Sequence, residues 1–63
     1  MYHYKKGVQF VKKGREKEAI EQFRIAIQKD ETLKEAYFDL GEIFMRNELY
    51  DESERIFKVL VEL

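Results

Sequence analysis

Apolar side chains recur at intervals of three and four residues along almost the whole chain of 63 residues. This spacing is typical of amphipathic α-helices, and no stretch shows the strict alternation of a half-buried strand. Proline, which would interrupt a helix, is absent. We therefore predict an all-α protein with four helices, which span about Tyr2–Lys13, Arg15–Lys29, Leu33–Arg46 and Leu49 to the end of the chain.

Short links connect these predicted helices. Gly14 follows two lysines, and a glycine in this place can end a helix in the left-handed conformation. Thr32 and Glu35 have the spacing of a capping box, which predicts the start of the third helix. Asn47 tolerates the left-handed conformation and is expected to form the next turn with Glu48. Because such short links force neighbouring helices to run antiparallel, we expect two helix hairpins.

The chain contains an internal repeat with a period of 34 residues. Identical residues that stand at this distance include Gly7 and Gly41, Phe10 and Phe44, and Phe23 and Phe57. A fixed period in this range is the mark of a repeat architecture. A glycine inside a helix costs up to about 1 kcal/mol relative to alanine, so both glycines are expected to permit close approach by a neighbouring helix. We expect a single domain, residues 1–63, with repeat 1 at about 1–33 and repeat 2 at about 34–63.

The second copy of the repeat, from Ala36 to Phe44, reads A-Y-F-D-L-G-E-I-F. This segment resembles the tetratricopeptide repeat, a helix–turn–helix unit of 34 residues. Tyr37, Leu40, Gly41 and Phe44 match the family pattern of its first helix. The chain departs from the pattern at His3, Lys6, Glu31, Ser53 and Leu60. The resemblance covers essentially the whole chain and implies two helix-turn-helix hairpins stacked as a short α-solenoid, a tetratricopeptide-like superhelix.

The resemblance also implies a function, because the first helix of each unit in this family lines a concave groove that binds peptides. The residues expected to line the groove here are Tyr4, Lys5, Val8, Lys12, Phe38, Asp39, Glu42, Met45 and Arg46. The alternative interpretation is a solvated face with scattered apolar residues. Tyr4 and Phe38 argue against it, since both are large and lie outside the pattern of core positions. We expect a non-catalytic interaction module with a protein or peptide partner.

The last eight residues, from Ile56 to Leu63, include six apolar side chains that point nearly all round a helix. A helix that is apolar on every side is expected to be buried on every side. Either the repeats continue in a longer array, or the chain is a scaffold unit that associates with itself here. A third interpretation, a fraying last turn, would leave several large side chains in water. The residues expected to mediate self-association are Ile56, Val59, Leu60, Val61 and Leu63.

Charge is divided unevenly between the two repeats. Residues 1–34 hold nine Lys or Arg and five Asp or Glu, a net charge of +4. Residues 35–63 hold three Lys or Arg and eight Asp or Glu, a net charge of −5. Head-to-tail stacking of copies would pair these opposite charges, and a symmetric dimer would bring the acidic ends together. Apolar burial contributes about 25 cal/mol per Å², which outweighs repulsion screened by salt. A symmetric homodimer is therefore the favoured form of self-association.

Composition narrows the remaining chemistry. The chain has no cysteine and one histidine, so we expect no disulfide, metal or cofactor, and its net charge of −1 argues against a nucleic-acid partner. No apolar run approaches the roughly 18 residues of a membrane span, and no signal segment opens the chain, so we expect a cytoplasmic protein. His3 falls at an aromatic packing position and Ser53 at a small-residue position without a nearby base, so no catalytic group is expected.

Overall fold

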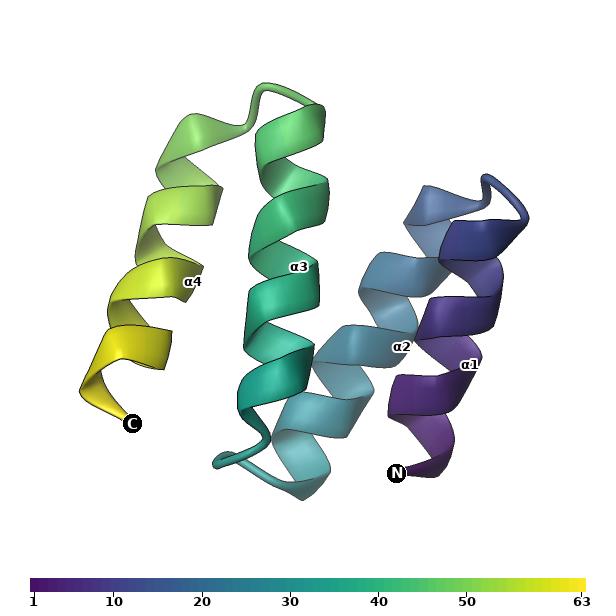
Figure 1. Cartoon of the computed structure of the whole chain (residues 1–63), viewed down its shortest axis with the longest axis horizontal. Helices are drawn as coiled ribbons and strands as arrows, with labels where there is room; N and C mark the ends of the chain where they lie inside the picture. Colours follow the sequence, from purple (N-terminus) through teal and green to yellow (C-terminus); the bar gives the residue numbers. More distant parts are fainter.

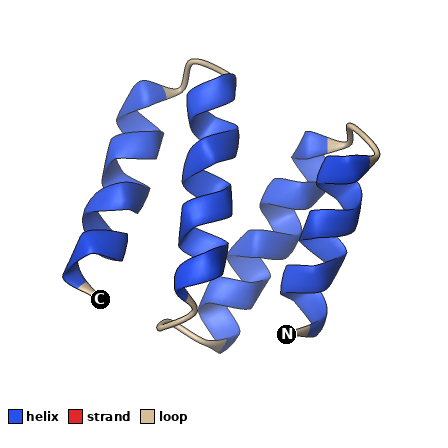
Figure 2. Ribbon diagram, viewed as in Figure 1, coloured by secondary structure: helices blue, strands red, loops and turns tan.

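The computed structural model describes residues 1–63 and contains four helices and no strand (Figures 1 and 2). The helices are α1 (Tyr2–Lys12), α2 (Glu16–Lys29), α3 (Lys34–Arg46) and α4 (Tyr50–Glu62). The prediction of an all-α protein built from two stacked hairpins is confirmed. Each predicted helix boundary lies within one residue of the observed one. The residues that differ are the caps, which flank the helical turns.

The four helices follow one another in space in the order of the chain (Figure 1). α1 packs against α2 and α3 against α4 to form the two hairpins, and α2 packs against α3 to join them. The principal extents of 28 × 26 × 13 Å describe a thin slab. α1 and α4 are therefore end helices, each with a packed neighbour helix on one side only.

The turns inside the two hairpins share one backbone conformation. Gly14 has a φ of 76°, so the prediction of a left-handed residue after the first helix is confirmed. The turn predicted at Asn47 and Glu48 is confirmed, but the left-handed residue is Glu48, with a φ of 61°, rather than Asn47, whose φ is −94°. Asn47 is held by its side chain, whose Nδ2 donates to the carbonyl oxygen of Ile43 at 2.8 Å. The left-handed residue falls on Glu48, the repeat equivalent of Gly14.

The link between the hairpins does not contain the expected capping box. α3 begins after Leu33 with no side-chain cap. The backbone N–H and the hydroxyl of Thr32 both donate to Asp30 Oδ1, at 3.0 and 2.7 Å. These bonds hold the pKa of Asp30 below its usual range. A carboxylate two residues upstream of Thr32 competes for its hydroxyl, and this local turn replaces the bond to the helix N-terminus.

The buried core lies between α2 and α3. All its fully buried apolar side chains come from these two helices: Ala19, Phe23, Ala26, Ala36, Tyr37, Leu40, Ile43 and Phe44. Each end helix contributes one small buried residue, Gly7 from α1 and Ser53 from α4. The Ser53 hydroxyl donates to the carbonyl oxygen of Gly41 at 3.1 Å. The two middle helices therefore supply most of the buried apolar side chains, which they pack against their neighbours on both sides.

Each hairpin closes on a contact between a glycine and a phenylalanine. A Cβ atom placed on Gly7 would lie 2.6 Å from Cε1 of Phe23. A Cβ atom on Gly41 would lie 2.7 Å from Cζ of Phe57, one repeat later. Real Cβ atoms do not approach ring carbons this closely, so a side chain at either position would force the helices or the ring to move. The expectation that both glycines permit close helix approach is confirmed.

We predict that Gly7→Ala lowers the free energy of unfolding more than Gly41→Ala does. Phe23 has no exposed surface and cannot move aside, so overpacking should cost about 2 kcal/mol. Phe57 is half-buried and can shift towards solvent, so the cost of Gly41→Ala should be about 1 kcal/mol or less. The measurement is urea unfolding followed by circular dichroism.

The control is Gly7→Ala in a Phe23→Leu background. With the ring gone, the added methyl group should no longer clash, and the higher helix propensity of alanine should stabilise by up to about 1 kcal/mol. Equal losses from Gly7→Ala in both backgrounds would contradict the proposed cause.

Candidate peptide-binding groove

A groove runs between α1 and α3, above α2. Its first hollow, of about 200 Å³, is lined by Val8, Val11 and Lys12 of α1, Phe23 of α2, and Asp39, Glu42, Ile43 and Arg46 of α3. α1 and α3 each pack on α2 rather than closely on each other, which leaves this space open. The groove thus follows from the way the two hairpins stack.

A second hollow, of about 440 Å³, continues the groove towards α4. It is lined by Tyr4, Lys34, Glu35, Phe38, Asp39 and Leu60. Asp39 borders both hollows, so they adjoin along α3. A smaller hollow of about 200 Å³ is bordered by Glu42, Met45 and Arg46. The groove residues of α3 are spaced by three and four positions, as expected for one face of a helix.

Eight of the nine residues expected in the groove line these hollows: Tyr4, Val8, Lys12, Phe38, Asp39, Glu42, Met45 and Arg46. Lys5 is exposed and lines none of them. Six further lining residues were not predicted: Val11, Phe23, Ile43, Lys34, Glu35 and Leu60. Val11 belongs to the same helical stripe as Tyr4 and Val8, and this spacing was a signal that would have found it.

Tyr4 bridges the groove from α1 to α3. Its hydroxyl donates to Asp39 Oδ2 at 2.7 Å, and its ring lies 5.7 Å from that of Phe23, measured between centroids. Burial, then the bond to Asp39 and the negative charges of Asp39 and Glu35, raise the pKa of Tyr4 to about 12. The Tyr4 hydroxyl therefore remains protonated and holds the two hairpins together across the groove.

Phe38 is the exposed aromatic side chain of the groove. It is 49% exposed, and its ring meets that of Phe57 in an edge-to-face arrangement with centroids 6.2 Å apart. Leu60 and Tyr4 border the same hollow. An aromatic ring supported on one side and open on the other offers apolar area at little further cost in side-chain entropy.

Charge in the groove is acidic in the middle. Asp39 and Glu42 form no ion pair, and Lys12 and Lys34 lie towards opposite ends of the groove. The guanidinium of Arg46 is paired with Glu16 instead, and donates to its Oε2 at 2.7 Å.

Glu16 is held on α2 by two donors from α3. Asn47 Nδ2 donates to Glu16 Oε1 at 2.9 Å, and Arg46 donates to Oε2. The bond from Asn47 and then that from Arg46 hold the pKa of Glu16 below its usual range. These bonds join the two hairpins at the end of the groove opposite to Tyr4.

The apolar residues of α4 that were expected to mediate self-association lie in different environments. Ile56 packs against the core, and Leu60 lines the groove. Val59, Val61 and Leu63 are exposed. At 100° per residue the apolar positions of α4 cover an arc of roughly 200°, with Val59 and Val61 near its opposite edges. The expectation of a helix that is apolar nearly all round is therefore corrected to a wide apolar arc, half of which is used inside the chain.

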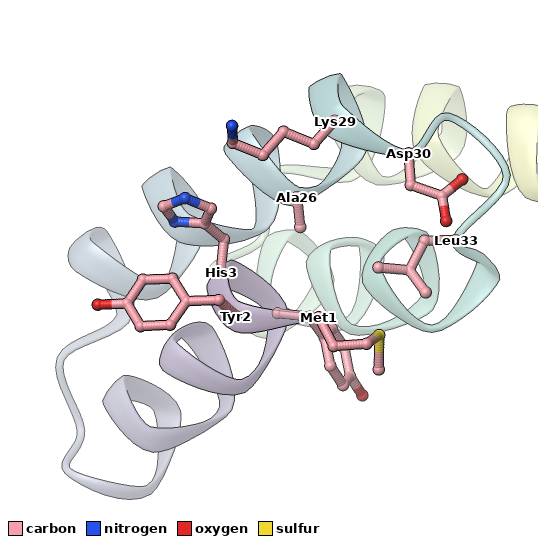
Figure 3. A pocket seen from close by; sticks show the side chains of 8 residues that line it. Met1, Tyr2, His3, Ala26, Lys29, Asp30 and Leu33 are labelled. Carbon is pink, nitrogen blue, oxygen red and sulfur yellow. The ribbon is translucent and has the colours of Figure 1, made fainter.

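A further hollow of about 340 Å³ lies at the N-terminal end of α1 and shares Tyr4 with the groove (Figure 3). It is lined by Met1, Tyr2, His3, Tyr4, Ala26, Lys29, Asp30 and Leu33. The side chains of Lys29 and Asp30 point in opposite directions (Figure 3).

His3 and Ser53 both have structural partners. His3 Nδ1 lies 2.8 Å from Gln22 Oε1, a hydrogen bond between α1 and α2. Ser53 is buried against Gly41, as described above. Neither side chain stands beside a group that would activate it as a base or nucleophile.

Comparison with protein-family models, with curated proteins and with solved structures finds no match. None of the four helices has the length and apolar character needed to cross a bilayer. The tetratricopeptide resemblance thus rests on the residues of the chain itself.

We predict that the protein loses stability as the pH rises from about 10 towards 12, partly because Tyr4 ionises. The pKa of Tyr4 is higher in the folded protein than its ordinary value of 10.0, so its contribution is present in full below pH 10 and is lost as the pH approaches 12. Tyr37, whose pKa is raised by burial and by nearby Glu31 and Asp30, adds to the loss.

The test is Tyr4→Phe, compared with Tyr2→Phe, whose hydroxyl is exposed. Tyr4→Phe should lower the free energy of unfolding by about 1 kcal/mol near neutral pH and make its alkaline decline shallower. Tyr2→Phe should do neither. Urea unfolding at a series of pH values measures both, and an equally steep decline in Tyr4→Phe would contradict the assignment.

Proposed function

We propose that this protein is a tetratricopeptide-like interaction module that binds a peptide segment of a partner protein in the groove between α1 and α3. The observation that carries the proposal is Phe38, a half-exposed aromatic side chain in the larger hollow of a groove formed by both repeats. Large aromatic side chains that pack into pockets are frequent binding hot spots.

The two adjoining hollows favour a ligand with two apolar anchors. One anchor would contact Phe38 and Leu60 in the larger hollow. The other would contact Val8, Val11 and Ile43 in the smaller one. Peptides bind such grooves by placing alternate or successive-turn side chains in separate apolar sites.

The charges between the two hollows favour a basic residue between the anchors. Asp39 borders both hollows and already accepts a hydrogen bond from Tyr4, while Glu42 has no ion-pair partner. A lysine or arginine placed between the anchors would complement these carboxylates. The proposed ligand class is therefore a peptide with two apolar anchors and a central basic side chain.

The test selects phage-displayed random peptides on the immobilised protein and measures the binding of enriched peptides by fluorescence anisotropy. Phe38→Ala should weaken binding about tenfold or more, which is the effect expected for loss of a hot-spot side chain. Glu42→Gln should weaken binding of peptides with a central basic residue by about threefold.

The control variant is Val59→Ala, which removes exposed apolar area on the far flank of α4. It should leave the dissociation constant unchanged within about twofold. Enriched peptides that bind Phe38→Ala as tightly as the wild type, or no enrichment at all, would refute the proposed function.

A further inference from the structure

One side of α4 corresponds, through the internal repeat, to the side of α2 that α3 covers, but no helix of the chain covers it in α4. α2 stands one repeat before α4, and α3 packs on it within the chain. Phe23 of α2 has no exposed surface, whereas its repeat equivalent in α4, Phe57, remains half-buried. Ile27 is half-buried, and its equivalent Val61 is 84% exposed. The internal repeat therefore shows what kind of neighbour would complete α4.

The side of α2 that meets α3 is a helical stripe of Glu16, Ile20, Phe23 and Ile27. Glu16 accepts hydrogen bonds from Arg46 and Asn47 of α3, and Ile20 and Ile27 pack against the core. Moving this stripe forward by one repeat defines the outer face of α4, which consists of Tyr50, Glu54, Phe57 and Val61.

The matching side of α3 is a stripe of Ala36, Leu40, Ile43 and Asn47. Moving it back by one repeat defines the outer face of α1, which consists of Tyr2, Lys6, Gln9 and Lys13. Here lysine and glutamine replace the leucine and isoleucine of α3. The outer face of α1 is therefore cationic, while that of α4 holds Glu54 among apolar side chains, with Lys58 near its edge.

We propose that the outer face of α4 binds the outer face of α1 in a second copy of this chain, in the arrangement by which α2 binds α3. In this register Glu54 stands opposite Gln9, with Lys6 and Lys13 one turn to either side. The stem of Lys6 covers the exposed side of Phe57 while its ammonium group reaches Glu54. The apolar residues Ile20 and Ile43 on the facing sides of α2 and α3 are thus replaced by the polar residues Glu54 and Gln9, flanked by opposite charges.

The overall charges agree with this head-to-tail contact. It joins residues 35–63, with a net charge of −5, to residues 1–34 of the next copy, with +4. A symmetric dimer through α4 would join two surfaces of the same negative sign. The apolar area that favoured the symmetric dimer is divided, because Ile56 and Leu60 are used inside the chain and Val59 and Val61 lie on opposite flanks.

Such stacking would lengthen the groove. The α1 helix of the second copy would pack on α4 and face α3 of the first copy across the groove, as α3 packs on α2 and faces α1 within the chain. Its Tyr4 would then occupy the place relative to Phe57 that Phe38 takes relative to Phe23. Repetition of one contact of this kind gives open chains of copies unless the rotation between them closes a ring.

The experiment uses two charge-reversed variants of the full chain and multi-angle light scattering over a concentration series. The α1-face variant carries Lys6→Glu and Lys13→Glu, and the α4-face variant carries Glu54→Lys and Val61→Lys. The control carries Lys17→Glu and Lys29→Glu, which gives the same net charge as the α1-face variant through exposed residues of α2. Circular dichroism checks that each variant is folded.

We expect the wild type to gain mass with concentration and to lose it when salt is added. Each face variant alone should need an at least tenfold higher concentration to associate, while the control should resemble the wild type. An equimolar mixture of the two face variants should recover association, because each supplies the intact face that the other lacks.

Three results would overturn the proposal. A wild type that is monomeric at every concentration would show that the outer face of α4 does not bind a second copy. Normal association of the α1-face variant, with loss only in the α4-face variant, would indicate the symmetric dimer. Equal weakening by the control would mean that net charge, rather than the face, is responsible.

Discussion

The fold depends on two contacts in which the ring of a phenylalanine packs against a glycine in the neighbouring helix. Gly7 lets Phe23 lie against the backbone of α1, and Gly41 lets Phe57 lie against that of α3. The helix propensity lost at each glycine is recovered by close packing of the hairpin. Because the two contacts are one repeat apart, the hairpins have similar shapes, and α2 and α3 can pack together and bury the core between them.

The groove is a consequence of this arrangement. Two hairpins of the same shape, joined through α2 and α3, leave space between α1 and α3 that their own side chains do not fill. The repeats differ in what they place there. α1 supplies Tyr4 and apolar side chains, whereas α3 supplies Phe38 and the carboxylates of Asp39 and Glu42. The two copies of the repeat thus have the same backbone shape, and the residues that differ between them determine the charge and apolar character of the groove.

The sequence predicted the elements well because helical periodicity and glycine chemistry are local properties. The close approach at Gly7 and the turn at Gly14 followed from single residues. The misplaced features depend on context that a single residue does not reveal: Asp30 takes the hydroxyl of Thr32, and the left-handed residue of the second hairpin falls on Glu48, where the repeat places Gly14 in the first. The groove was placed largely through the repeat register, whereas the position of Leu60 in it depends on how α4 packs on α3, which periodicity alone does not determine.

Each hairpin is closed by the same kind of contact, between a glycine and a phenylalanine, and nuclear Overhauser spectroscopy tests this most directly. We predict cross-peaks from the α-protons of Gly7 to the ring protons of Phe23 and from those of Gly41 to the ring of Phe57, with both glycine α-protons shifted by the rings above them. Cross-peaks in one hairpin only, or glycine shifts typical of solvent-exposed helix, would contradict the account.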